Sequence, residues 1–245
     1  MLILKPYIFN PYPEIIFGFS PRFAAGITLD IGFNLSYSVG DDVNSVNSNR
    51  KLFFNELGLM NENVSYQHQV HNDRIVFVNK SGLCGESDAL ITAQKGLGLA
   101  ISIADCTPVF IYDPVNKIIA AVHSGWRGTE KKILMKTIKQ LLQDHKSNPQ
   151  NLIVYIGPSI SQVNYEVGKE VGEKFGEKYL TGNGDKFLLD VNGVNYDLLL
   201  EAGLKKNNIQ KSGLCTYEYS ELFHSYRRDG NRSGRSLGII AMKPE

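Results

Sequence analysis

Two continuous apolar runs in the middle of the chain, VFIY at 109–112 and IIAAV at 118–122, predict a pair of buried strands. The intervening residues 113–116, Asp-Pro-Val-Asn, have the composition of a tight turn, so we expect the two strands to form a hairpin. Similar apolar runs predict further strands at 74–79, 151–158 and 236–242, and two strands within 89–105 on either side of a turn at 95–98.

Apolar positions at helical spacing predict four helices, at 48–59, 130–146, 165–175 and 195–204. The second is the clearest, with an apolar stripe opposite a lysine-rich face and Thr129 as its expected N-cap. The third contains several glycines, and its prediction rests on apolar residues repeating every four positions. Hairpins mixed with helices, rather than strict βαβ alternation, favour an α+β fold with mixed sheets packed between helix layers.

Composition narrows the functional classes. The 245 residues show no linker or repeat, so we expect one catalytic domain over 1–245. A net charge of +1 gives no sign of a nucleic-acid surface or an obligate protein partner. There is no membrane-length apolar run and no signal peptide, and the three scattered cysteines do not suggest a disulfide framework. The expectation is a soluble cytoplasmic protein.

Reactive side chains stand at the ends of the predicted strands. Asp105 and Cys106 precede the first strand of the hairpin, His123 ends the second, and His71 precedes another strand. Their separations are far longer than those of a zinc finger, but strand ends can bring such groups together on one rim. Two histidines and a thiolate would make a catalytic zinc site with one open position. Alternatively, Cys106 is a small buried apolar residue and the histidines are structural.

Two glycine-containing segments add candidate ligand contacts. In Ser124-Gly-Trp-Arg-Gly128, Trp126 could stack on a flat ring and Arg127 could bind an anion, or the two could be a core anchor and a surface charge. Near the C-terminus Arg227, Arg228 and Arg235 lie close to Asp229, and three guanidiniums beside a metal site would suit phosphate. A solvated turn is the plainer interpretation.

The motifs ADCTPVFIYDP, AAVHSGWRGT, QVH, IGPSI…YEVG and SYRRDG…GR, in their order along this chain, closely resemble the YfiH-like family. The resemblance extends to VGDD, Asn49-Arg50 and ESDALIT, and covers about 19–242. The family is also called laccase-domain proteins or multicopper polyphenol oxidases, and its members include bacterial purine nucleoside phosphorylases. Ser159 and Asn164 stand where many relatives carry cysteines, and Asn72 stands where glycine is usual.

The resemblance implies an α/β/β/α layered sandwich, related in its Cys/His site to bacterial toxin deamidases. It implies zinc held by His71, Cys106 and His123, with phosphorolysis of adenosine, inosine, guanosine and methylthioadenosine, plus adenosine deamination. Asp105 and Glu86 are the candidate proton carriers, because the HxE motif of zinc deaminases is absent. Candidate contacts to nucleoside and phosphate are Arg50, Gln69, Trp126, Arg127, Tyr226, Arg227 and Arg228.

Other chemistries remain open. The site's residue types would also suit copper, but the chain's five histidines are too few for the trinuclear cluster of a laccase. In a metal-free Cys–His hydrolase or deamidase, Cys106 would be the nucleophile, His123 its base, and a polar third group would orient that base. A non-catalytic protein that keeps the fold is the least favoured alternative, since the site residues are intact.

Overall fold

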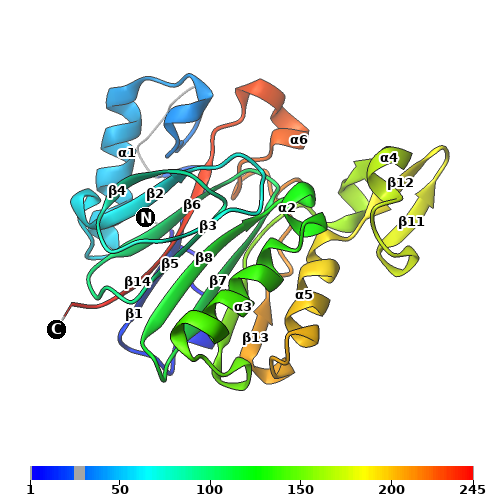
Figure 1. Cartoon of the computed structure of the whole chain (residues 1–245). Coiled ribbons are helices and arrows are strands. Elements are labelled where there is room, and N and C mark those ends of the chain that lie inside the picture. Colours follow the sequence, from blue (N-terminus) through cyan, green and yellow to red (C-terminus); the bar gives the residue numbers. More distant parts are fainter. Residues whose placement is uncertain (1, 25–30, 245) are drawn as a thin grey trace.

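The computed structural model describes residues 2–24 and 31–244, in which two large β-sheets stack face to face with helices on their outer sides (Figure 1). A third, small sheet lies at one side of the molecule. Over the described residues, no helix combines the length and the apolar character needed to cross a bilayer.

The first sheet has the order β1-β14-β6-β2-β4. Strands β1, β14 and β6 pair antiparallel, whereas β2 runs parallel to both β6 and β4. The strands span Ile15–Phe19 (β1), Ser236–Met242 (β14), Gly98–Ile103 (β6), Val64–His68 (β2) and Gly82–Glu86 (β4).

The second sheet has the order β13-β9-β7-β8-β5-β3. Its centre is the predicted hairpin, β7 and β8, and every residue of both strands is buried. The strands span Ile209–Lys211 (β13), Ile153–Ile156 (β9), Thr107–Asp113 (β7), Ile118–Ser124 (β8), Ala89–Thr92 (β5) and Ile75–Phe77 (β3). Because both faces of this sheet are covered, its strands read as unbroken apolar runs, and this made the hairpin visible in the sequence.

Three apolar cores explain the layering. One lies between the sheets, where Phe17 of β1 packs edge-on against Phe110 of β7. The second lies between the six-stranded sheet and the helices α3 (Ile133–His145) and α5 (Val191–Glu201). The third lies between the five-stranded sheet and α1 (Val43–Glu56). The order helix, sheet, sheet, helix confirms the predicted α/β/β/α sandwich with mixed sheets.

The small sheet, of order β10-β12-β11, forms a lobe with the short helix α4. Its elements span Glu166–Val167 (β10), Lys169–Gly172 (α4), Leu180–Asn183 (β11) and Lys186–Leu189 (β12). The apolar centre of the lobe contacts Trp126, so the lobe is anchored beside the segment that follows β8.

Two helix predictions were wrong in part. Thr129 is not an N-cap but lies buried inside α2 (Trp126–Glu130), and α3 starts separately after Lys132, whose φ of 58° interrupts the helix. The helix predicted at 165–175 is a two-residue strand followed by the single turn α4. The first predicted helix starts earlier than expected, because the Asp42 carboxylate accepts the backbone N–H of Ser45 and caps α1.

Candidate metal centre and active site

His71, Cys106 and His123 converge on one rim of the sandwich. His71 follows β2, Cys106 immediately precedes β7, and His123 lies in β8 opposite Pro108. One ligand atom from each residue lies within 4.8 Å of the other two, and His71 Nε2 is 3.8 Å from Cys106 Sγ. His123 is buried, Cys106 half-buried and His71 exposed, so the cluster opens to solvent on the His71 side.

The backbone at this rim is strained in two places. His71 and Asp105 have φ values of 57° and 88°, in the left-handed region that non-glycine residues rarely adopt. The Asp88 carboxylate accepts the backbone N–H groups of Val70, His71 and Asn72 at 3.3, 3.0 and 2.7 Å. These bonds hold the His71 turn, and the same carboxylate accepts Nδ1–H of His123 at 2.8 Å.

Gly125 leaves room for the cluster. A Cβ at this position would lie 2.8 Å from Cys106 Sγ and 3.3 Å from His71 Cδ2. Any side chain there would therefore displace two of the three candidate ligands, which explains why the chain turns from β8 into α2 through glycine.

The cluster changes the protonation of its members. Burial alone would raise the pKa of the Cys106 thiol, but the charge of His123 and hydrogen bonds from both histidines lower it to about 6. Burial alone would lower the pKa of His123, yet the Cys106 thiolate and the Asp88 carboxylate raise it to about 9. The Asp88 pKa lies below its usual value, against the effect of burial, because His123 and backbone amides donate to it. At neutral pH the metal-free site thus favours a thiolate beside an imidazolium.

The donor set fits a metal ion. Within residues 2–24 and 31–244, these three residues are the group of histidine, cysteine and acidic side chains close enough to share one ion. Asp88 occupies Nδ1 of His123 and so leaves its Nε2 as the ligand atom, the usual way in which a carboxylate orients a metal-binding histidine. Two imidazoles and a thiolate are ligands suited to zinc, and their types would also accept copper.

Asp105 and Gln69, both predicted to act in the site, make structural hydrogen bonds. The Asp105 carboxylate accepts Thr216 Oγ1–H and the backbone N–H of Arg227, both at 2.7 Å, and so ties the Cys106 turn to the C-terminal segment. The Gln69 side-chain amide pairs with both backbone groups of Ser102 in β6. Both residues therefore fix the loops that carry the ligands.

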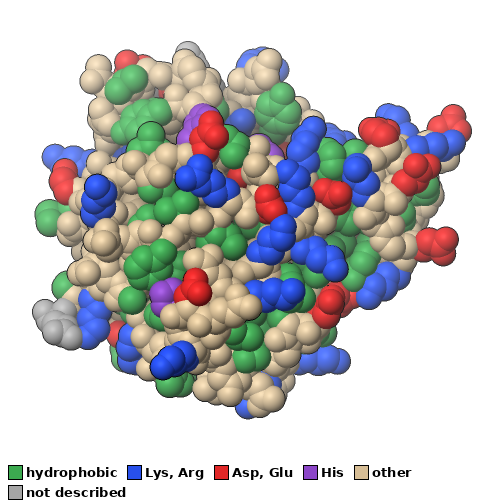
Figure 2. Space-filling view, in the orientation of Figure 1, with side chains coloured by type: hydrophobic (Ala, Val, Ile, Leu, Met, Phe, Trp, Pro, Cys, Tyr) green, Lys and Arg blue, Asp and Glu red, His purple; other side chains and the backbone are tan. Residues whose placement is uncertain are grey.

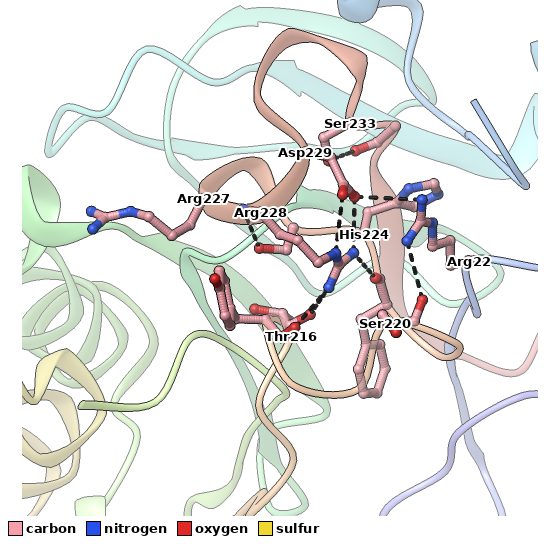
Figure 3. A network of polar contacts seen from close by, with 12 residues as sticks. Arg22, Thr216, Ser220, His224, Arg227, Arg228, Asp229 and Ser233 are labelled. Atoms are coloured by element: carbon pink, nitrogen blue, oxygen red, sulfur yellow. Dashed lines mark hydrogen bonds and ion pairs between the residues drawn. The ribbon is translucent and has the colours of Figure 1, made fainter. Parts of the chain in front are cut away.

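Arg227 and Arg228 point in opposite directions from the short helix α6 (Tyr226–Asp229) (Figure 3). The five N–H groups of Arg228 donate to the carbonyls of Thr216, Tyr217 and Phe223 and to both carboxylate oxygens of Asp229. All five N–H groups of Arg228 thus have partners within the chain, and its role in substrate binding stays a prediction.

Arg227 is placed differently. Its side chain is exposed, its guanidinium lies 5.2 Å from the Tyr165 ring, and Nη1 donates to the Glu166 carbonyl of the small lobe. It keeps further donors for an anion.

Arg50 and Tyr226 have partners of their own. Arg50 is a buried residue of α1, and its Nε donates to the Leu35 carbonyl while its guanidinium lies against the rings of Tyr37 and Tyr66. Tyr226 is half exposed and lies under the guanidinium of Arg235. Roles for Arg50 and Tyr226 in substrate binding stay predictions.

Trp126 and Arg127 open α2 directly after Gly125, with the Arg127 guanidinium 4.2 Å from the indole. Lys and Arg side chains gather on the surface over α2 and α3 (Figure 2), among them the exposed Lys131 and Lys136. Such a surface favours the approach of an anion.

Sequence reasoning missed Asp88 and Tyr165. Burial first, and then the negative charge of Cys106, raises the pKa of the Tyr165 phenol above its usual range. A carboxylate directly in front of the apolar strand β5 was the available signal for Asp88, as Asp105 is in front of β7.

Solved structures share this architecture. The chain superposes on the crystal structure of the Bacillus licheniformis hypothetical protein YfiH with a TM-score of 0.93 and 28% identity, covering 98% of this chain and 96% of that one. The model of a family described as multi-copper polyphenol oxidoreductase laccase matches residues 25–243, and the chain belongs to this family.

Proteins of similar sequence are named for a different activity from the one in the family description. A Corynebacterium glutamicum protein called purine nucleoside phosphorylase is 33% identical over 224 residues, which are 87% of this chain and 88% of the relative. A Deinococcus radiodurans protein of the same name is 35% identical over 218 residues, covering 86% and 82% of the two chains.

Proposed function

We propose that this protein is a zinc-dependent purine nucleoside phosphorylase that uses adenosine, inosine, guanosine and methylthioadenosine, and that it also deaminates adenosine. The observation that carries the proposal is the convergence of His71, Cys106 and His123 within 4.8 Å. It occurs in a chain whose relatives are named purine nucleoside phosphorylases.

His71, Cys106 and His123 would hold the zinc. When bound, zinc supplies a Lewis acid that polarises phosphate or water. The family name suggests copper, but the other three histidines do not extend the cluster. His145 stacks on Phe77, and His224 contacts the Phe33 carbonyl. His68 is exposed at the end of β2, where it pairs with Glu86 of β4. A multicopper cluster therefore lacks its ligands.

In phosphorolysis a phosphate oxygen forms a bond to the anomeric carbon of the ribose while the bond from that carbon to the purine nitrogen breaks. The purine leaves with the electron pair and takes up a proton, and ribose 1-phosphate remains. Arg127 and Arg227 have exposed guanidiniums that would hold the phosphate dianion in line for attack, and Arg235 lies near enough to feel the charge of Cys106. These arginines would therefore position the phosphate that acts as the nucleophile.

The purine would stack on the aromatic side chains beside the cluster. Trp126 and Tyr165 each pack against the apolar core of the small lobe, and each lies against an arginine. An aromatic face suits a flat base.

Deamination additionally needs a proton carrier. Glu86 is exposed at the end of β4, and its carboxylate accepts no hydrogen bond from the residues that the structure describes. Both carboxylate oxygens of Asp105, in contrast, accept hydrogen bonds. We assign the anchoring role to Asp105 and retain Glu86 as the candidate carrier.

The test is product analysis of adenosine incubated with purified protein, with and without phosphate. Adenine and ribose 1-phosphate that form only with phosphate would support phosphorolysis, and inosine in either condition would support deamination. Unchanged adenosine, inosine, guanosine and methylthioadenosine with zinc present in the protein would refute the proposal.

A second candidate is a metal-free Cys–His hydrolase. The specific observation is the lowered pKa of Cys106 next to His123, with Asp88 on the far side of the imidazole as the third group of a nucleophile–base–orienter series. This candidate requires activity without metal or phosphate and covalent trapping of Cys106 by an electrophilic substrate analogue. The zinc enzyme requires loss of activity with a chelator.

A further inference from the structure

Asp88 joins the two histidines of the candidate metal centre. Its side chain is fully buried at the crossover from the five-stranded sheet to the six-stranded sheet. Oδ1 accepts the backbone N–H of His71 at 3.0 Å and Nδ1–H of His123 at 2.8 Å. Oδ2 accepts the backbone N–H of Asn72 at 2.7 Å and that of Val70 at 3.3 Å. One carboxylate therefore receives four donors, three from the loop after β2 and one from strand β8.

The backbone of Asp88 adds to this link. Its carbonyl accepts the His123 N–H at 2.7 Å, and its own N–H donates to the Arg74 carbonyl at 3.0 Å. His123 is thus held by Asp88 through both its main chain and its ring. Asp88 holds His71, in contrast, only through the His71 backbone N–H. The backbone of His71 is in a left-handed conformation that needs such support.

No neutral side chain of the same shape can replace this carboxylate. An asparagine has one accepting oxygen and one donating NH₂ group. If its NH₂ took the place of Oδ2, it would face the N–H groups of Val70 and Asn72. If it took the place of Oδ1, it would face the His71 N–H, and His123 would have to carry its proton on Nε2, the atom needed for the metal.

We propose that Asp88 is a positioning residue that sets the tautomer of His123 and the turn of His71 together, and so prepares both ligands for the metal. This rests on the proposed metal-dependent function. It predicts that loss of the Asp88 charge weakens metal binding by about 10- to 100-fold, the usual effect of losing a carboxylate behind a metal-binding histidine.

The chain offers a matched control in Asp113. This carboxylate is also fully buried and accepts backbone N–H groups, from Val115 and Asn116, but it lies in the turn at the opposite end of β7. Asp113→Asn should cost stability without touching the metal site.

The experiment measures zinc affinity by competition with a chromophoric chelator for the wild type, Asp88→Asn and Asp113→Asn, together with the thermal unfolding of each. We expect weaker binding by about 10- to 100-fold in Asp88→Asn alone. Equal zinc affinity in all three proteins would overturn the proposal and leave the metal-dependent function standing. A wild type that binds no zinc would overturn both.

A second measurement does not depend on a variant that folds. In the zinc-loaded wild type, ¹H–¹⁵N NMR of the histidine rings should place the His123 proton on Nδ1. A proton on Nε2 would contradict the assignment of Asp88 as the group that sets the tautomer, whatever the activity of the enzyme.

Discussion

The two ends of the β7–β8 hairpin use the same device for different purposes. At the turn end, the buried Asp113 accepts the N–H groups of Val115 and Asn116 and closes a tight connection. At the open end, the buried Asp88 accepts the N–H groups of the His71 turn and also an imidazole. A buried carboxylate organises the backbone at both ends, but only the open end also carries a thiol and two imidazoles.

The difference lies in the donors that each carboxylate receives. Amide donors fix only the backbone to which they belong. An imidazole that donates Nδ1–H to a carboxylate is held in one orientation and one tautomer, which leaves its Nε2 to bind a metal. The apolar hairpin supports both ends equally, since every residue of β7 and β8 is buried. A core strand pair can thus serve as a stable mount while chemistry is confined to one end.

Removal of the Cys106 thiol at the open end of the hairpin should cause the largest loss of activity. Cys106→Ala deletes a proposed metal ligand, and we expect kcat/KM for phosphorolysis to fall by on the order of 1,000-fold or more. The control is Cys84→Ala on the edge strand β4, which should keep wild-type activity. Comparable activity in the two variants would exclude Cys106 from the reaction.

Crowding the same end should have the next largest effect. In Gly125→Ala the new methyl group would lie 2.8 Å from Cys106 Sγ, so the thiol must move. A displacement of about 1 Å in an active site costs roughly 100-fold in rate. Gly213→Ala, where no atom lies within 4 Å of the added Cβ, is the control in steady-state assays. Full activity of Gly125→Ala would mean that the observed spacing does not matter.

Neighbouring arginines sharpen the comparison further. Arg227→Ala removes an exposed guanidinium with donors left for an anion, and we expect the KM for phosphate to rise by about 10- to 100-fold, as for one or two charged hydrogen bonds. Arg228→Ala removes internal bonds to Thr216, Phe223 and Asp229, so it should lower the melting temperature and leave the phosphate KM unchanged. The opposite pattern would show that the roles are reversed.

The turn end should yield only a stability effect. Asp113→Asn should lower the free energy of unfolding by about 1–3 kcal/mol, the cost of unsatisfied buried groups, with kcat unchanged. Burial alone would raise the pKa of Asp113, but hydrogen bonds from Asn116 and Val115 keep it below its usual value in the folded state. Its contribution is therefore complete above the unfolded pKa of about 3.9 and is lost as pH falls through the lower folded value. Urea unfolding from pH 7 to pH 3 should show that the free energies of unfolding of the wild type and of Asp113→Asn converge as the pH falls.

The sequence predicted the features that depend on local pattern. The hairpin and the strand-end positions of His71, Cys106 and His123 followed from apolar runs and turn residues, and the layered order followed from the family resemblance. The helix break at Lys132 was missed because no glycine or proline marks it, and Glu130, Lys131 and Lys132 are residue types that helices accept readily. The segment at 165–175 was predicted as one helix, but it contains the two-residue strand β10 and the single turn α4, and β10 pairs with β12, which comes later in the chain.

The support of the site was harder to predict than its ligands. Asp88 acts across 17 and 35 positions of sequence, and no spacing rule links it to His71 or His123. Arg227 and Arg228 are identical in type and adjacent, and only the direction of each side chain separates an anion contact from an internal bond network. Such roles depend on tertiary geometry.

The central claim is that the open end of the hairpin holds a metal that phosphorolysis requires. The most direct measurement removes the metal with a chelator, confirms its loss by elemental analysis, and follows ribose 1-phosphate formation from adenosine before and after zinc is restored. The account predicts that activity disappears with the metal and returns with about one zinc per chain, as three ligands around one open position imply. Full phosphorolysis by the metal-free protein would contradict it.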